Sequence, residues 1–153
     1  MNNKLMFSSK TDLWETPQDF FDALNAEFHF DLDACATAKN AKCNQFFSPE
    51  DDGLEQKWSG VVWCNPPYGK TVGKWCEKAL SESRDGTTVV MLLPARTDTR
   101  WFHDYIYGNA EIRFVKGRLK FGAAQNAAPF PSMVFIFGQK AAQMGAGGDI
   151  TYD

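Results

Sequence analysis

The chain has 153 residues, of which 44% are hydrophobic and 23% are charged. A length and composition of this kind are typical of a single globular domain. The 13 Phe, 5 Trp and 4 Tyr residues exclude intrinsic disorder for most of the chain. The net charge of −3 argues against a protein that coats nucleic acid without selectivity. No stretch approaches the roughly 18 apolar residues of a membrane-spanning helix, so we expect no membrane partner.

The charges are unevenly distributed along the chain. Residues 1–68 carry a net charge of −6, whereas residues 69–120 carry a net charge of +4. Half of the molecule could therefore face a polyanion, while the other half does not. Two solvated surfaces with a chance asymmetry explain the same pattern equally well.

Four cysteines and two histidines are the candidates for disulfides or a metal site. The cysteines lack the CxxC spacing of a zinc site, and the two histidines lie far apart in the sequence. The start of the chain also lacks the apolar stretch of a signal peptide. We therefore expect reduced, buried thiols in a cytosolic protein and no metal.

The chain divides into a flexible arm over residues 1–10, a folded domain over 11–138 and a flexible tail over 139–153. The first predicted helix covers 17–28, with Thr16 as its N-cap and Pro17 at its first helical position. Phe20, Phe21, Leu24 and Phe28 give this helix its apolar face.

Alternating apolar and polar residues then predict a strand over 28–33 and a short second strand over 44–47. The apolar run at 61–64 predicts a buried strand of a parallel sheet. Pro66 and Pro67 donate no ladder hydrogen bonds, so the chain must leave the sheet at Asn65.

Later segments continue the alternation of helices and strands. We expect a helix over 72–83, a strand over 88–93 that Pro94 ends, a helix around 101–106, and strands over 112–115 and 133–137 that a long loop separates. This order is typical of an α/β sheet with right-handed crossovers. Ligands bind beyond the carboxyl ends of the strands in such sheets, where Asp33 and Asn65 lie.

The tetrapeptide Asn65-Pro66-Pro67-Tyr68 is the most informative stretch. The lone pair of an aromatic amine is delocalised, and two acceptors on its N–H groups would localise it. The Asn65 side-chain oxygen and the Pro66 carbonyl can supply both acceptors. The prolines hold that carbonyl in place, and Tyr68 offers a face on which a base can stack. The alternative interpretation is a proline-rich strand exit with a satisfied turn asparagine.

Several motifs in this order resemble the small phage-type DNA N-6-adenine methyltransferases. They are WETP (14–17), FDLDACAT (30–37), DDGL (51–54), WCNPPYGK (63–70), LLPART (92–97), WF (101–102) and GRLKF (117–121). The resemblance runs from Trp14 to Gly138, which is nearly the whole predicted domain. The series is more specific than the NPPY element, which amino-methyltransferases of several substrate classes share.

The resemblance implies a minimal, single-domain, three-layer Rossmann-like methyltransferase fold, with a mostly parallel twisted sheet and a late antiparallel strand. It implies S-adenosyl-L-methionine as cofactor and site-specific methylation of a flipped adenine at N6 in DNA. The implied catalytic residues are Asn65, Pro66, Pro67 and Tyr68. The implied cofactor-binding residues are Thr16, Pro17, Asp33, Ala34, Cys35, Asp52 and Asn65.

Several of these assignments keep a structural alternative. Asp33 could instead cap the segment that follows its strand, and Asp52 could belong to a solvated acidic turn. The glycine-rich loop that usually follows the first strand is absent, because Ala-Cys-Ala-Thr follows Asp33.

The predicted nucleic-acid contacts are Lys70, Arg96, Arg118 and Phe121. Each basic residue taken alone is more often an ordinary surface charge. No separate target-recognition domain is evident, so the DNA sequence would be read by loops such as 122–131 or by a second subunit in an oligomer, or else the specificity is weak. The resemblance places the protein in the cytoplasm of a bacterial host, encoded by a phage or prophage.

Two other functions fit the same residues. An amino-methyltransferase could act on a guanine amine in RNA or on a glutamine amide in a protein, because both amines suit the same pair of acceptors. A non-catalytic DNA-binding module would use only the basic half of the chain.

Overall fold

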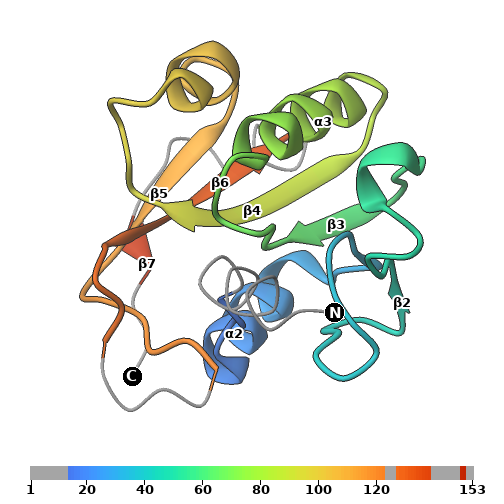
Figure 1. Cartoon of the computed structure of the whole chain (residues 1–153), viewed down its shortest axis with the longest axis horizontal. Helices are drawn as coiled ribbons and strands as arrows, with labels where there is room; N and C mark the ends of the chain where they lie inside the picture. Colours follow the sequence, from blue (N-terminus) through green and yellow to red (C-terminus); the bar gives the residue numbers. More distant parts are fainter. Residues whose placement is uncertain (1–13, 123–126, 139–148, 151–153) are drawn as a thin grey trace, which may run out of the picture.

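A computed structural model of the chain describes residues 14–122, 127–138 and 149–150. Its strands are β1 (Leu32–Asp33), β2 (Gln45–Phe46), β3 (Val61–Cys64), β4 (Thr88–Pro94), β5 (Glu111–Val115), β6 (Ser132–Phe137) and β7 (Asp149–Ile150). Within these ranges the seven strands form one sheet in the order β2-β1-β3-β4-β6-β5-β7 (Figure 1).

The sheet is mixed but mostly parallel. Every neighbouring pair of strands in the described residues runs parallel, except the two pairs that contain β6. The strand β6 lies between β4 and β5 and is antiparallel to both. The predicted α/β class and the late antiparallel strand are therefore confirmed.

Helical segments lie on both faces of the sheet (Figure 1). The helix α3 (Val72–Arg84) covers one face together with the π-helical turn η2 (Phe102–Ile106). The helix α2 (Gln18–Phe28) lies on the other face, where the ring of Phe21 packs edge-on against Trp63 of β3, with 5.5 Å between ring centroids. The 3₁₀ turn η1 (Gly53–Glu55) precedes β3.

The central strands form the core because they are covered on both faces. Every residue of β4 and of β6 is buried. Strands that are covered in this way read as continuous apolar runs rather than as alternating ones. For this reason the predicted bounds of β3, β4 and β6 agree with the observed ones to within one residue.

The start of α2 differs from the prediction. The helix begins at Gln18, Pro17 occupies the N-cap position, and no side chain caps the helix. The hydroxyl of Thr16, predicted to be the cap, instead accepts a hydrogen bond from Asn65 Nδ2 at 2.9 Å. The predicted N-cap role of Thr16 is therefore wrong, because a more distant partner engages its side chain.

The strand predicted over residues 28–33 is also shorter in the structure. Phe28 is still helical, and His29 ends the helix with a left-handed backbone (φ 58°). The residues between His29 and Leu32 connect the helix to the sheet, so only Leu32 and Asp33 form β1.

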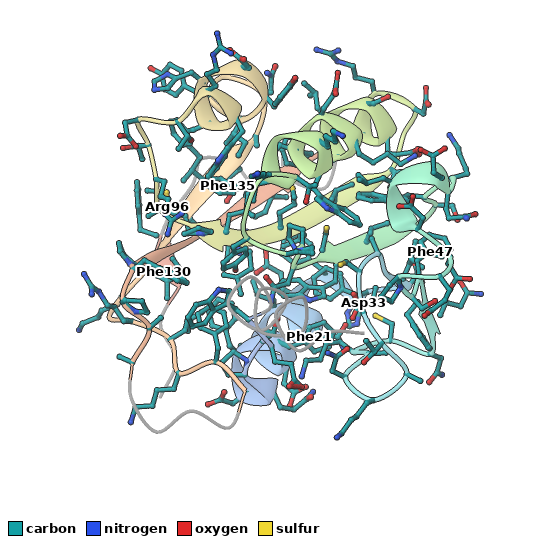
Figure 2. All side chains as sticks on the ribbon, in the orientation of Figure 1. Phe21, Asp33, Phe47, Arg96, Phe130 and Phe135 are labelled. Carbon is teal, nitrogen blue, oxygen red and sulfur yellow. The ribbon has the colours of Figure 1, made fainter. Side chains whose placement is uncertain are left out.

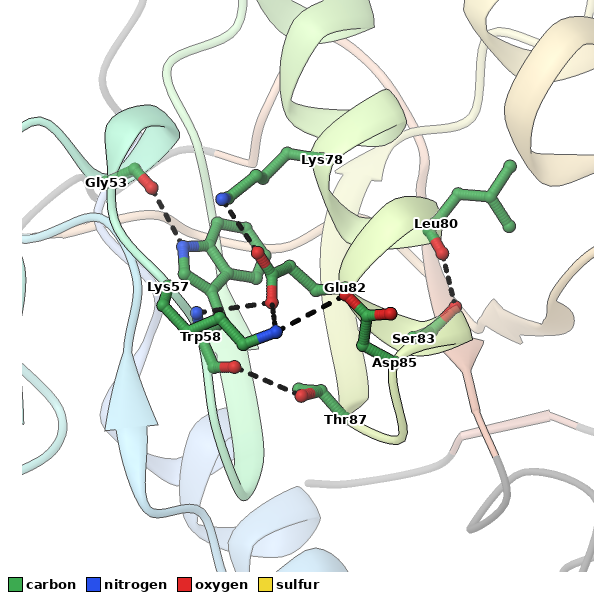
Figure 3. A network of polar contacts seen from close by, with 9 residues as sticks. All are labelled: Gly53, Lys57, Trp58, Lys78, Leu80, Glu82, Ser83, Asp85 and Thr87. Atoms are coloured by element: carbon green, nitrogen blue, oxygen red, sulfur yellow. Dashed lines mark hydrogen bonds and ion pairs between the residues drawn. The ribbon is translucent and has the colours of Figure 1, made fainter.

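A polar network fastens the segment before β3 to α3 (Figure 3). The indole Nε1 of Trp58 donates to the carbonyl of Gly53 at 2.8 Å, and its backbone N–H donates to Glu82 at 3.3 Å. Glu82, which is buried, also pairs with Lys78 at 2.8 Å, and Thr87 donates to the carbonyl of Trp58. The network thereby fixes the position of η1 relative to α3.

Two predicted segments fall largely outside the described residues. The arm over 1–10 does so completely. Within the predicted tail, Asp149 and Ile150 form β7, which pairs with Phe114 and Val115, and the remainder is not described. In the described ranges, no helix is both long enough and apolar enough to cross a bilayer.

Candidate active site

The strands β1 and β3 lie side by side, so the residues at their carboxyl ends are neighbours. Asp33 ends β1, and Asn65 follows the last residue of β3. Both residues border one cavity of about 320 Å³ at this edge of the sheet. The prediction that these two side chains share a site is consistent with this arrangement.

Asp33 is 2% exposed, and its two carboxylate oxygens accept different backbone hydrogen bonds. Oδ1 accepts from the N–H of Cys35 at 3.2 Å, and Oδ2 accepts from the N–H of Lys42 at 3.0 Å. Burial raises the pKa of Asp33 to about 6, although these hydrogen bonds oppose the shift. The carboxyl therefore caps the turn that follows β1 and also faces the cavity.

Asn65 has both amide hydrogens occupied and its oxygen free. Nδ2 donates to the carbonyl of Trp14 at 2.5 Å and to the hydroxyl of Thr16 at 2.9 Å. A carbonyl oxygen can only accept, so the Trp14 contact fixes which amide atom is the nitrogen. Oδ1 is buried and has no hydrogen-bond partner among the residues that the structure describes. The site thus holds an unused acceptor.

The two prolines take different positions. Pro67 borders the cavity, whereas Pro66 is buried and does not. Across the described ranges, no backbone or side-chain group donates to the Pro66 carbonyl. Together with Asn65 Oδ1, that carbonyl is the second acceptor to which no described residue donates.

Most residues implied as cofactor contacts border the cavity. Thr16, Asp33, Ala34, Cys35, Asp52 and Asn65 all do so. Pro17 does not; it occupies the N-cap position of α2, where its carbonyl accepts from the N–H of Phe21. Burial raises the pKa of the Cys35 thiol to about 12, so this cysteine lines the cavity as a neutral thiol.

Further residues to which the sequence assigns no site role also border the cavity, among them Trp14, Lys42, Gly53 and Trp75. Gly53 is the most constrained of them, since a Cβ there would collide with the carbonyl oxygen of Ala34. Gly53 lets η1 approach the turn after β1 closely. The position of Gly53 in the DDGL motif was the feature of the sequence that could have indicated its place at the cavity.

Tyr68 does not border the cavity. Its ring is 5% exposed, and its hydroxyl donates to the carbonyl of Leu92 at 3.0 Å. Phe121 and Phe130 pack edge-on against it, with ring centroids 6.3 and 5.7 Å away. The face that is predicted to stack on a base is therefore covered in this structure.

The predicted nucleic-acid contacts separate into two groups. Lys70, Arg96 and Arg118 are exposed. Phe121 is buried, its ring also packs against Trp14 with 5.5 Å between centroids, and its assignment as a nucleic-acid contact stays a prediction. Figure 2 shows Arg96 beside Phe130 on one side of the molecule and Asp33 on the other, and the Arg96 guanidinium lies 5.6 Å from the centre of the Phe130 ring.

Within the described part of the chain, no three His, Cys, Asp or Glu side chains gather in a way that could hold a metal ion. The site offers a buried carboxyl, a cavity at the edge of a mostly parallel sheet, and two acceptors, Asn65 Oδ1 and the Pro66 carbonyl, to which no group in the described ranges donates. The mixed, mostly parallel α/β sheet that carries this site is consistent with a methyltransferase-like fold.

Comparison with known proteins identifies the family. The sequence profile of the DNA N-6-adenine-methyltransferase (Dam) family matches residues 4–146. A DNA N-6-adenine-methyltransferase of Haemophilus phage HP1 is 34% identical over 143 residues, which cover 87% of this chain and 82% of the phage protein. The chain belongs to the DNA N-6-adenine-methyltransferase family.

Two other relatives match in part. A DNA N-6-adenine-methyltransferase of Escherichia phage T1 is 34% identical over 111 residues, or 71% of this chain. The match spans about half of that phage protein, at 46% of its length. The putative methyltransferase YfdM of Escherichia coli K12 is 37% identical over 65 residues, which cover 37% of this chain and 71% of the relative.

Proposed function

We propose that this protein transfers a methyl group from S-adenosylmethionine to the N6 amine of adenine in DNA. Its family and the names of its phage relatives support this reaction. Within the chain, the observation that carries the proposal is the buried oxygen of Asn65, which lacks a hydrogen-bond partner in the described ranges. A buried acceptor of this kind costs free energy until a donor reaches it.

Asn65 and Pro66 would together activate the target amine. The lone pair of adenine N6 is delocalised into the ring, which makes the nitrogen a poor nucleophile. Hydrogen bonds from its two N–H groups to Asn65 Oδ1 and the Pro66 carbonyl would localise that lone pair. Because the ring of Pro66 and that of Pro67 fix φ, the carbonyl needs no reorganisation during the reaction. The methylated nitrogen then releases its proton to water.

The cavity bordered by Asp33 and Asn65 would hold the cofactor, which supplies an electrophilic methyl group on sulfonium. The lining fits its chemistry, since the Asp33 carboxyl suits a cationic ammonium or a ribose hydroxyl, and the apolar walls suit the rest of the molecule. Asp52 is exposed at the rim, where it would accept from a ribose hydroxyl. Gly53 would take over the close backbone approach that a glycine-rich loop usually provides.

The fold supports the same proposal. We infer that the sheet is a minimal form of the Rossmann-like methyltransferase sheet, with β6 reversed between β4 and β5 and helices on both faces. Ligands of such sheets bind beyond the carboxyl ends of the strands, and the cavity lies at that edge.

The substrate would be a base that has left the duplex, because stacking and pairing hide the N6 amine. Lys70, Arg96 and Arg118 are exposed and would contact phosphates near the flipped base. We expect the reaction to take place in the cytoplasm of a bacterial host, in keeping with the phage origin of the relatives and the free state of the four cysteines.

A substrate panel tests the proposal. The full chain is incubated with S-adenosylmethionine that carries a labelled methyl group and with DNA, RNA or glutamine-containing peptides in turn. We expect labelled N6-methyladenine in the digested DNA. Label that appears only in guanine of RNA or in glutamine would overturn the choice of substrate, and cofactor binding without any methyl transfer would overturn the enzymatic proposal.

A further inference from the structure

We propose that Thr16 and the carbonyl of Trp14 act as a clamp that orients the amide of Asn65, which makes Thr16 a positioning residue for methyl transfer. The inference rests on the proposed function and deepens it. It goes beyond the cofactor contact that the family resemblance implies for Thr16, because Thr16 here acts through Asn65.

The hydrogen bonds of Asn65 carry the first step of the argument. An amide NH₂ group has two donors, and both are used, one by the Trp14 carbonyl and one by the Thr16 hydroxyl. If the amide turned over, its oxygen would face the lone pairs of the Trp14 carbonyl, and the nitrogen would take the place of the free acceptor. The clamp therefore fixes the orientation of the amide, so that Oδ1 and not the NH₂ group is available to accept a hydrogen bond from the target amine.

The hydroxyl of Thr16 is available for this task for local reasons. Pro17 restricts the backbone of the residue before it to extended conformations, which sets the direction of Thr16 in advance. Pro17 also takes the N-cap position of α2, and no side chain caps that helix. The Thr16 side chain, in a residue that is 5% exposed, is thus free to turn toward Asn65.

The segment that carries the clamp is held from its other side as well. The carbonyl of Glu15 accepts from the N–H of Gly122 at 2.8 Å. The ring of Trp14 packs edge-on against Phe121 and Phe130, with centroids 5.5 and 5.1 Å away. These contacts restrain the Trp14 carbonyl, so the clamp is a fixed frame and not a single hydrogen bond.

The first test compares three variants of the full chain. Thr16→Val removes the acceptor but keeps the shape, Thr16→Ser keeps the hydroxyl, and Thr87→Val is the matched control. Thr87 is also 5% exposed, and its hydroxyl bonds the carbonyl of Trp58, away from the cavity. We expect Thr16→Val to lower kcat roughly tenfold to a hundredfold, with a change of less than about twofold in the Kd for S-adenosylmethionine. Thr16→Ser should recover most of this loss.

Two outcomes of this comparison would overturn the clamp. A raised Kd for S-adenosylmethionine with kcat unchanged would make Thr16 a cofactor contact only. An equal loss of kcat in Thr16→Val and Thr87→Val would assign the effect to general loss of packing.

A second measurement needs no activity. The side-chain NH₂ signals of Asn65 are assigned in a ¹H–¹⁵N spectrum by their loss in Asn65→Ala. We expect both protons to exchange slowly with water in the unaltered protein and one of them to lose this protection in Thr16→Val. Equal exchange in the two proteins contradicts the clamp. If the protection is present but no nucleic acid is methylated, the proposed function fails while the clamp stands.

Discussion

At the scale of single residues, Asp33 shows how burial and hydrogen bonding compete at one carboxyl. Burial raises its pKa from the ordinary 3.8 to about 6, against the effect of two backbone N–H donors and of the nearby Lys42 charge. Folding therefore disfavours the ionised form. The contribution of this group to the free energy of unfolding is complete below about pH 4 and is lost as the pH rises through about 6.

A cationic ligand would reverse this preference, because it favours the carboxylate. We predict that the affinity for S-adenosylmethionine is constant above pH 7 and falls toward pH 5, approaching a tenfold loss per pH unit below the pKa of Asp33. Calorimetric titration between pH 5 and pH 8 measures this dependence, with Asp33→Asn as the variant in which it should vanish. An affinity of the unaltered protein that is the same at pH 5 and pH 8 would rule out a role for this carboxyl.

The residues whose positions in the fold the sequence could predict are those at strand ends. Asp33 and Asn65 follow apolar runs, and parallel strands bring such ends together. Tyr68 and Phe121 could not be placed in this way, because four segments that are distant in sequence bury them in one aromatic cluster. The partner of Thr16 was equally hidden, since Asn65 lies 49 residues away.

At the scale of elements, the close approach of η1 to the end of β1 shapes one wall of the cavity. A Cβ on residue 53 would collide with the carbonyl of Ala34, and the ring of Trp75 is also close. We predict that Gly53→Ala pushes these segments apart, lowers the free energy of unfolding by about 1–3 kcal/mol and weakens cofactor binding.

Chemical denaturation and calorimetry check this prediction, and Gly73→Ala is its control. Gly73 lies in α3, and its nearest contact for a Cβ is an ordinary 3.7 Å from Trp101. The control should therefore be neutral or stabilise the helix by about 0.5–1 kcal/mol. An equal free energy of unfolding for Gly53→Ala and Gly73→Ala would contradict the prediction, because it would show that η1 and the turn after β1 accommodate the added methyl group without cost.

The elements that the sequence predicts best are those whose bounds depend on burial alone. Apolar runs define β4 and β6, because both faces of these strands are covered. The short strand β1 depends on the left-handed turn at His29, and η2 depends on a bond from the N–H of Tyr107 to the carbonyl of Phe102, which makes it π-helical. No periodicity of hydrophobic residues reports such local backbone geometry.

At the scale of the whole molecule, the uneven charge distribution bears on DNA binding. Arg118 is exposed and lies in the segment that leads to Phe121, which packs against Trp14 next to Asn65. We predict that Arg118→Ala weakens DNA binding and lowers the slope of log affinity against log salt by about 0.9, the value for one phosphate contact.

The control for this measurement is Arg84→Ala. Arg84 is exposed and is the last residue of α3. The thirteen residues of this helix separate it along the chain from the loop that carries Asn65. Fluorescence anisotropy at several salt concentrations gives both slopes. The same slope for Arg118→Ala and the unaltered protein would remove Arg118 from the DNA surface.

The feature on which the proposed chemistry depends most is the buried oxygen of Asn65 at the cavity, for which the described residues supply no donor. The direct measurement is the single-turnover rate of adenine methylation in Asn65→Ala, taken together with the Kd for S-adenosylmethionine. We predict a fall of at least about a hundredfold in rate with little change in Kd, because the variant removes an acceptor that acts on the amine. A rate within a few-fold of the unaltered protein would contradict the account.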